Sequence, residues 1–155
     1  MKVMSSEIVH KRDPAAVRRI LESLPDWFGD PAAIENYATA ADDSQFVSRV
    51  AIDGGNTVGV SLTRRHFHES AELHLIAVDP AAQRQGIGRA LIDQAAGDLR
   101  ADGCKMLSVH TVGPSFDNEP YTRTRAFYRA AGFIPLEEHN NLDWDGPTLI
   151  LVRQI

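Results

Sequence analysis

Apolar residues in the first part of the chain recur with the spacing of one short strand and two helices. Residues 6–10 have strand character, and the next apolar positions lie on one face of a helix that should cover a sheet. These positions are Val17, Ile20, Leu21 and Leu24. Asp13-Pro14 and Asp30-Pro31 each supply a capping residue followed by proline at the first helical position, which predicts helices over about 14–24 and 31–41.

The remaining pattern alternates between strands and helices. Two β-rich runs, 45–52 and from 57 onward, flank a glycine turn and predict a hairpin. Further strands are predicted over 71–78, 105–112, 133–138 and 148–153, with helices over 86–101 and 122–131, the second ended by Gly132. The order predicts a mixed α/β fold in a single domain, residues 1–155.

Composition and charge narrow the classes of function. The chain has 155 residues, 43% hydrophobic and 24% charged, which suits one globular domain. A net charge of −5 without a basic block argues against nucleic acid as a partner and is compatible with a cationic substrate. One cysteine, Cys104, an N-terminus without the apolar core of a signal peptide, and no membrane-length apolar segment predict a cytoplasmic protein. The oligomeric state is left open between a monomer and a homodimer.

The segment 78–91 carries the clearest chemical pattern. It runs from a strand through Asp79-Pro80 into a helix that opens with Gly86 and Gly88. Glycines at a helix start let an anion approach free backbone N–H groups, so a phosphate site is predicted, with a purely structural glycine turn as the alternative. The pattern lacks the third glycine of a dinucleotide fingerprint and the Gly-Lys-Ser/Thr of a P-loop.

Two ordered motifs resemble signatures of the GNAT acetyltransferase superfamily. Gln83-Arg84-Gln85-Gly86-Ile87-Gly88, after a strand ending Val-Asp-Pro, resembles the pyrophosphate loop of that family. The run 125–133 resembles its second signature, a helix that carries Phe-Tyr and ends in Gly-Phe. The element order is similar over essentially the whole chain, and the runs 24–29, 111–115 and 121–125 resemble a subgroup of uncharacterised bacterial members.

This resemblance implies a GNAT-like fold, with a mixed, mostly antiparallel sheet flanked by helices, and acetyl-CoA as cosubstrate. It also implies two groups of cosubstrate-binding residues, one on the phosphate loop and one on the preceding strand, whose backbone would hold the pantetheine arm and polarise the thioester carbonyl. The residues are Gln83, Arg84, Gln85, Gly86, Ile87, Gly88 and Arg89 on the loop and Ile76, Ala77 and Val78 on the strand. The chain departs from the family pattern at Tyr121 and Thr124, where many members have asparagine and a small residue.

Tyr128 and Glu72 are the predicted catalytic residues. Tyr128 matches the general acid of the family, and a phenol is protonated at pH 7 and can give a proton to a departing thiolate; aromatic packing is the alternative. Glu72 is the predicted base, on a strand where alternation would place it on one face with His74 and Ile76. Water or His74 are alternatives for the base.

The acceptor pocket is predicted around Asp26, Trp27 and Phe28, between the first two helices, because two aromatic rings beside a carboxylate suit a cationic amine. Burial in the core is the alternative for both rings. The three histidines 66, 68 and 74 lack the spacing of a closed zinc site, so no metal is expected. The expected function is acetyl transfer to a primary amine of a small molecule by direct attack in a ternary complex. Acetylation of a protein or peptide, and acetyl-CoA sensing without turnover, are the alternatives.

Overall fold

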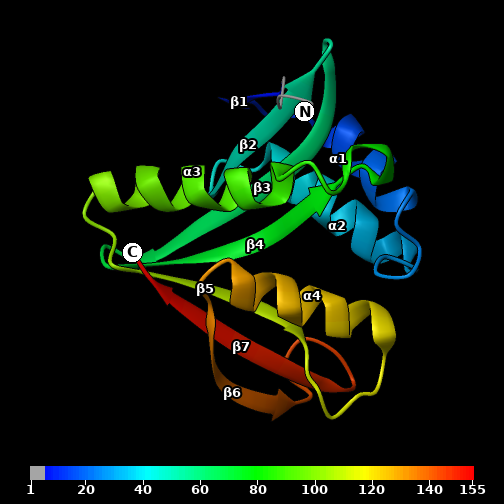
Figure 1. The fold of residues 1–155 in the computed structure, drawn as a ribbon, viewed down its shortest axis with the longest axis vertical. Helices are drawn as coiled ribbons and strands as arrows, with labels where there is room; N and C mark the ends of the chain where they lie inside the picture. The colour runs from blue at the N-terminus through cyan, green and yellow to red at the C-terminus, as the bar shows by residue number, and fades with distance from the viewer. Residues whose placement is uncertain (1–5) are drawn as a thin grey trace.

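The computed structural model describes residues 6–155, and its elements follow the predicted order (Figure 1). Residues 1–5, which carry much of the expectation that no leader is present, lie outside the described part. The strands are β1 (Glu7–His10), β2 (Phe46–Asp53), β3 (Asn56–Phe67), β4 (Ser70–Val78), β5 (Met106–Val112), β6 (Ile134–Asn140) and β7 (Pro147–Gln154). The helices are α1 (Pro14–Glu22), α2 (Pro31–Asp42), α3 (Ile87–Ala101) and α4 (Glu119–Ala130), with a short 3₁₀ turn at Pro80–Ala82.

The predicted helix starts at the two Asp-Pro pairs are confirmed. The Asp13 carboxylate accepts a hydrogen bond from the backbone N–H of Ala16 at 3.2 Å, and the Asp30 carboxylate accepts one from Ala32 at 3.0 Å. Helix α4 begins three residues earlier than predicted, because the Asn118 side chain caps its first turn.

All seven strands form one sheet in the order β1-β2-β3-β4-β5-β7-β6. Every neighbouring pair is antiparallel except β4 and β5, which run parallel. The prediction of a mixed, mostly antiparallel sheet flanked by helices is therefore confirmed.

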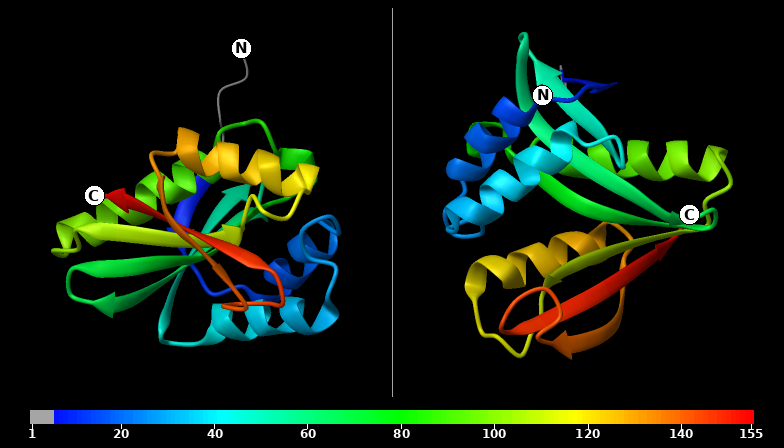
Figure 2. Two further views of the ribbon diagram at one scale, coloured as in Figure 1. Left: turned by 90° about the horizontal axis from the view of Figure 1, so that it is seen from below. Right: turned by 180° about the vertical axis from the view of Figure 1, so that it is seen from behind.

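The core is divided between two groups of strands (Figures 1 and 2). Helices α1 and α2 pack on one face of β2, β3 and β4, where Ile20, Val60 and Leu75 belong to one buried cluster. Helices α3 and α4 contribute to a second cluster with β5 and β7, which includes Leu107 and Leu151. No helix among residues 6–155 is long and apolar enough to cross a membrane.

Strands β4 and β5 pair over four residues only, from Ser70 opposite Met106 to Leu73 opposite Val109. Both strands continue beyond that point, to Val78 and Val112, and they diverge (Figure 2). Their facing edges have no strand partner there, and the Val78 and Val112 carbonyls accept from the Gln83 and Arg125 side chains instead. Other backbone groups on these edges can bind a ligand.

One expectation about β4 is wrong in detail. The register between β3 and β4 shifts at His74, since Leu62 lies opposite Leu75 while Thr63 lies opposite Leu73. This bulge reverses the alternation: Glu72 and His74 lie toward α2, whereas Ile76 packs against the buried cluster to which Ile87 of α3 belongs. Because of this one extra residue, the predicted base Glu72 and the predicted pantetheine contact Ile76 lie on opposite faces of β4.

Candidate functional site

A cleft of about 890 Å³ opens where β4 and β5 diverge. Its walls come from the α1–α2 loop, α2, β4, the start of α3, the end of β5, α4 and the β6–β7 loop. Most predicted site residues line it: Trp27, Phe28, Glu72, Ile76, Ala77, Val78, Gln83, Arg84, Gly86, Ile87, Gly88, Arg89 and Tyr128. Asp26 and Gln85 are the two that do not.

The start of α3 forms an open backbone turn at one end of the cleft. Arg84 and Gly86 both have left-handed backbone angles, with φ of 64° and 79°, and Gly86 is the N-cap of α3. A side-chain carbon added to Gly86 would meet no atom within 4 Å, so its surroundings are open. The first N–H groups of the helix have no partner within the helix, and with the helix dipole they suit an anionic group.

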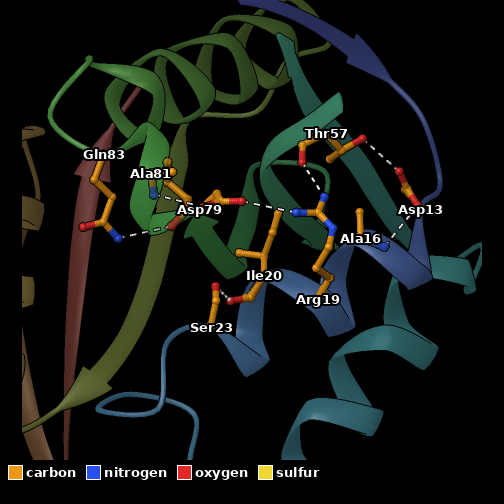
Figure 3. A network of polar contacts seen from close by, with 10 residues as sticks. Asp13, Ala16, Arg19, Ile20, Ser23, Thr57, Asp79, Ala81 and Gln83 are labelled. Atoms are coloured by element: carbon orange, nitrogen blue, oxygen red, sulfur yellow. Dashed lines mark hydrogen bonds and ion pairs between the residues drawn. The ribbon is translucent and has the colours of Figure 1, made fainter. Parts of the chain in front are cut away.

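A polar network holds the chain that leads into this turn (Figure 3). The Arg19 guanidinium of α1 donates to the Asp79 carboxylate at 3.2 Å and to the Thr57 carbonyl at 2.6 Å. Asp79 in turn accepts from the N–H of Ala81 at 3.0 Å, and the Gln83 amide donates to the Val78 carbonyl at 3.2 Å. The turn is therefore fixed to β3, β4 and α1 before any ligand binds.

The two predicted phosphate-binding arginines differ in their contacts. The Arg89 guanidinium donates to the Asp93 carboxylate at 3.1 Å and to the Ala130 carbonyl, the last residue of α4, at 2.6 Å. Arg84 is exposed. Arg84 is thus the better placed of the two to contact a phosphate, while Arg89 joins α3 to α4.

Gly88 brings the two sequence motifs together. A side-chain carbon added to Gly88 would lie 3.1 Å from the ring of Phe127, which is closer than ordinary packing. The absence of a side chain therefore lets the start of α3 approach α4 next to Tyr128, and the phosphate loop and the Phe-Tyr helix share one cleft.

Tyr128 is buried, with 6% of its surface exposed, and packs edge-on to Phe133 at 5.7 Å between ring centroids. Burial raises the pKa of its hydroxyl well above the usual value for tyrosine, and the neighbouring Tyr37 and Tyr121 add to the shift. The hydroxyl therefore stays protonated over the neutral range and is available as a hydrogen-bond donor. The three tyrosines of the chain all line this cleft.

Glu72 is held by two histidines. Its carboxylate accepts from His66 at 3.2 Å on one oxygen and from His74 at 3.3 Å on the other. The hydrogen bonds from His74, the larger cause, and from His66 lower the pKa of Glu72 to about 2, although partial burial opposes the shift. Glu72 is therefore a stable anion and a weak proton acceptor.

Trp27 joins the α1–α2 loop to α4. Its indole N–H donates to the Thr124 hydroxyl at 2.9 Å, and its backbone carbonyl accepts from the Tyr121 hydroxyl at 2.9 Å. The two positions that depart from the family pattern are thus the two that hold Trp27. Phe28 packs edge-on to Tyr37 at 5.8 Å, and Tyr37 packs against His74 at 5.3 Å.

Asp26, predicted in the acceptor pocket, is exposed and does not line the cleft. The cleft has two other carboxylates, Glu72 and Asp143. Asp143 lies in the β6–β7 loop and accepts a hydrogen bond from His110 Nδ1 at 2.9 Å. Sequence reasoning did not find this pair, because 33 positions separate the residues and only the fold brings them together.

Among residues 6–155, no cluster of histidine, cysteine or carboxylate side chains has the arrangement of a metal site. His66 and His74 both contact Glu72, whereas His68 lies in the turn between β3 and β4, beside Gly103.

Comparisons with known proteins identify the family of the chain. Residues 42–135, more than half of the chain, match the family model described as the acetyltransferase (GNAT) domain. The chain is similar to mycothiol acetyltransferases from Beutenbergia cavernae (37% identity over 70 residues, 45% of this chain) and Actinosynnema mirum (29% over 133 residues, 79% of this chain). It spans only 22% and 41% of the lengths of those two relatives.

Solved structures share the fold at low sequence identity. A GNAT-family acetyltransferase from Desulfovibrio desulfuricans superposes with a TM-score of 0.85 at 23% identity, over 96% of this chain and 98% of that one. The ribosomal-protein-S18-alanine N-acetyltransferase of Escherichia coli gives 0.78 at 22% identity, over 97% and 94%. The PaiA N-acetyltransferase of Thermoplasma acidophilum, in complex with coenzyme A, gives 0.76 at 18%, over 98% and 100%. With the family model covering most of the sheet and both motifs, the chain belongs to the GNAT acetyltransferase family.

Proposed function

We propose that the chain transfers the acetyl group of acetyl-CoA to a primary amine of a small molecule, by direct attack in a ternary complex. One observation carries the proposal: the open N-terminus of α3 and the unpaired edge of β4 face the same cleft. The first suits the pyrophosphate and the second suits the pantetheine arm. The Thermoplasma acidophilum structure, which shares this fold, is a complex with coenzyme A, and this supports coenzyme binding as such.

Different segments along the cleft are proposed to bind different parts of acetyl-CoA. The backbone from Gln83 to Arg89, with the Arg84 side chain, would hold the pyrophosphate, and residues 76–78 would hydrogen-bond the pantetheine arm. A backbone N–H on that edge would also stabilise negative charge that develops on the thioester oxygen. Acetyl-CoA supplies an activated acetyl group when it is bound.

Tyr128 is proposed to act as a neutral donor and Glu72 as an anion. Tyr128, kept protonated by its burial, donates a hydrogen bond or a proton to the departing sulfur. Glu72, kept ionised, favours binding of a cationic amine beside the rings of Phe28 and Tyr37.

One feature favours a small acceptor over a protein, and a second favours a cationic acceptor. The contacts of Trp27 with Thr124 and Tyr121 connect the α1–α2 loop to α4, and this bridge restricts the approach of a bulky acceptor. The carboxylates of Glu72 and Asp143 in the cleft favour a cationic molecule. Similarity to mycothiol acetyltransferases favours an amine related to mycothiol as a member of this class.

The test is release of the free thiol from acetyl-CoA, followed with a thiol-reactive dye. The acceptors are spermidine, glucosamine, kanamycin, an amine related to mycothiol and an alanine-initiated peptide. Turnover with at least one small amine is expected. Turnover with the peptide alone would replace the proposal with peptide acetylation, and coenzyme binding without any turnover would indicate a sensing domain.

Gly86→Glu is the matched site variant, because it places a carboxylate where the phosphates must approach. Gly97→Glu is its control: the same substitution lies further along α3, where an added side-chain carbon meets nothing within 4 Å. Gly86→Glu should lose acetyl-CoA binding and turnover, while Gly97→Glu keeps both. Equal affinity in the two folded variants would contradict the phosphate assignment.

A further inference from the structure

His110 lies on β5, directly after the point at which β4 and β5 stop pairing. It follows Val109, the last β5 residue paired with β4, and Val109 points into the second core. By strand alternation His110 points to the other face, the one on which Glu72 and His74 lie. His110 and Glu72 both line the cleft, and His110 contributes to the electrostatic shift at Glu72.

The Asp143 carboxylate fixes the orientation of the His110 ring. Because a carboxylate can only accept, the contact at 2.9 Å places a proton on Nδ1 of His110. In the neutral ring Nε2 then carries the free lone pair. The loop that holds Asp143 is itself fixed, since the Trp144 indole donates to the Pro147 carbonyl at 3.1 Å and packs edge-on to Phe116.

Glu72 and His74, the other candidate proton acceptors, are less suited to this role than His110. Both carboxylate oxygens of Glu72 are occupied by His66 and His74, and the anion is too weak a base for an ammonium group. The His74 ring is packed between the rings of Tyr37 and Phe46, at 5.3 and 4.8 Å. His110 has a carboxylate of its own and a partly exposed ring that borders the cleft.

We propose that His110, oriented by Asp143, accepts the proton that the acceptor amine loses during acetyl transfer. The inference rests on the proposed function. The bound ammonium first gives one proton to Nε2 of His110, which passes it to water. The free amine nitrogen then forms a bond to the acetyl carbon as the carbon–sulfur bond breaks, and its second proton leaves by the same route. The departing thiolate, stabilised by a hydrogen bond from Tyr128, takes a proton from water. Glu72 serves as the anion that binds the amine.

His110→Gln tests the proposal, because glutamine keeps a polar side chain of similar length but cannot accept the proton. With the panel amine that wild type acetylates fastest, kcat should fall by about 10²–10⁴-fold with little change in the amine KM or in acetyl-CoA affinity. The decline of the wild-type rate toward low pH, in the range where histidine titrates, should flatten. The other titratable groups on this part of the cleft are Glu72, His74, Tyr37, Tyr121, Tyr128 and Asp143, so the same profile is recorded for Glu72→Gln, which should raise the amine KM instead.

His139→Gln is the matched control. His139 forms a comparable pair with Glu137, at 2.8 Å, on the exposed strand β6 and away from the cleft. Its rate and pH profile should equal those of wild type. Asp143→Asn, in an exposed loop, serves as a second variant, and it should lower kcat as His110→Gln does.

A second readout needs no substrate. Nitrogen NMR of histidine-labelled wild type should show the His110 ring protonated at Nδ1, and Asp143→Asn should shift the ring toward the Nε2-protonated form. A wild-type kcat in folded His110→Gln, a loss confined to KM, or a ring unprotonated at Nδ1 would each overturn the inference. A wild type that acetylates no amine of the panel would overturn the proposed function itself.

Discussion

The surroundings of Tyr128 determine how it can assist a departing thiolate. A thiol has an ordinary pKa of about 8.5, and burial holds the Tyr128 pKa above the tyrosine value of about 10. Complete proton transfer from this phenol is therefore unfavourable in the empty cleft, while hydrogen-bond donation to the sulfur is favourable. Tyr128 should act mainly as a strong donor to the developing negative charge.

Tyr128→Phe should accordingly lower kcat by about 10²-fold, toward the lower end of the range for general acid catalysis. Acetyl-CoA affinity should stay near that of wild type, because the ring remains and only the hydroxyl is removed. Steady-state kinetics and calorimetry of acetyl-CoA binding measure the two effects separately. A wild-type kcat would show that Tyr128 serves only in packing.

Glu72 should make the stability of the fold depend on pH. Its pKa lies at about 2 in the folded protein against a reference value of 4.5, so the carboxylate stabilises the fold above about pH 4.5 and loses that contribution as the pH falls toward 2. The shift corresponds to at most about 3 kcal/mol, shared with the two histidines.

In urea unfolding between pH 6 and pH 3, Glu72→Gln should show a smaller loss of unfolding free energy than wild type. Glu69→Gln, in the exposed turn between β3 and β4, is the control and should follow wild type. Parallel curves for wild type and Glu72→Gln would mean that the contacts with His66 and His74 do not stabilise the fold.

At the scale of elements, the sequence predicted most of the framework and only part of the site. The Asp-Pro starts and the glycine-opened helix are local signals, and each lies within a few residues of its observed place. The bulge at His74 is not local, because it depends on the register between β3 and β4, and for that reason alternation assigned Ile76 to the wrong face. The pair of His110 and Asp143 likewise depends on how the β6–β7 loop returns to β5.

The fold explains the two positions, Tyr121 and Thr124, at which the chain departs from the family pattern. Both side chains bond to Trp27, 94 and 97 positions earlier in the chain, so they form a contact between the α1–α2 loop and α4. Arg123 adds a guanidinium 5.6 Å from the centroid of the Trp27 ring. The bridge makes Trp27 part of the cleft wall and not a residue of the deep core.

Trp27→Leu should raise the KM of the acceptor several-fold, because the wall that the amine contacts loses its ring and its hydrogen bond. Acetyl-CoA affinity should be spared, since the α3 turn lies at another part of the cleft. Thr124→Val removes only the hydrogen bond and should change KM in the same direction by less. Loss of thermal stability with an unchanged KM would assign the loop to the core and the acceptor to another part of the cleft, around Tyr121 and Trp144.

At the scale of the whole molecule, the parallel pair of β4 and β5 is the narrow connection between two groups of strands. Four residue pairs join them, and each group has its own buried cluster. Helix α3 connects the second cluster to a smaller third one: its Ile92 belongs to the second, while Ile87 belongs to the third, against which Ile76 of β4 packs. A ligand that fills the cleft contacts both groups and should stabilise their arrangement.

Coenzyme A should therefore raise the melting temperature by mass action. At a concentration of 100 times its Kd, binding to the folded state adds about 2.7 kcal/mol to the free energy of unfolding. For a domain of this size that is a shift of roughly 5–11 °C, measurable by scanning calorimetry. Gly86→Glu should show almost no shift and Gly97→Glu the full one, since only the first places a carboxylate at the phosphate turn. An equal shift in both variants would mean that coenzyme A stabilises the protein from a different surface, and the divergence of β4 and β5 would then have to serve another ligand.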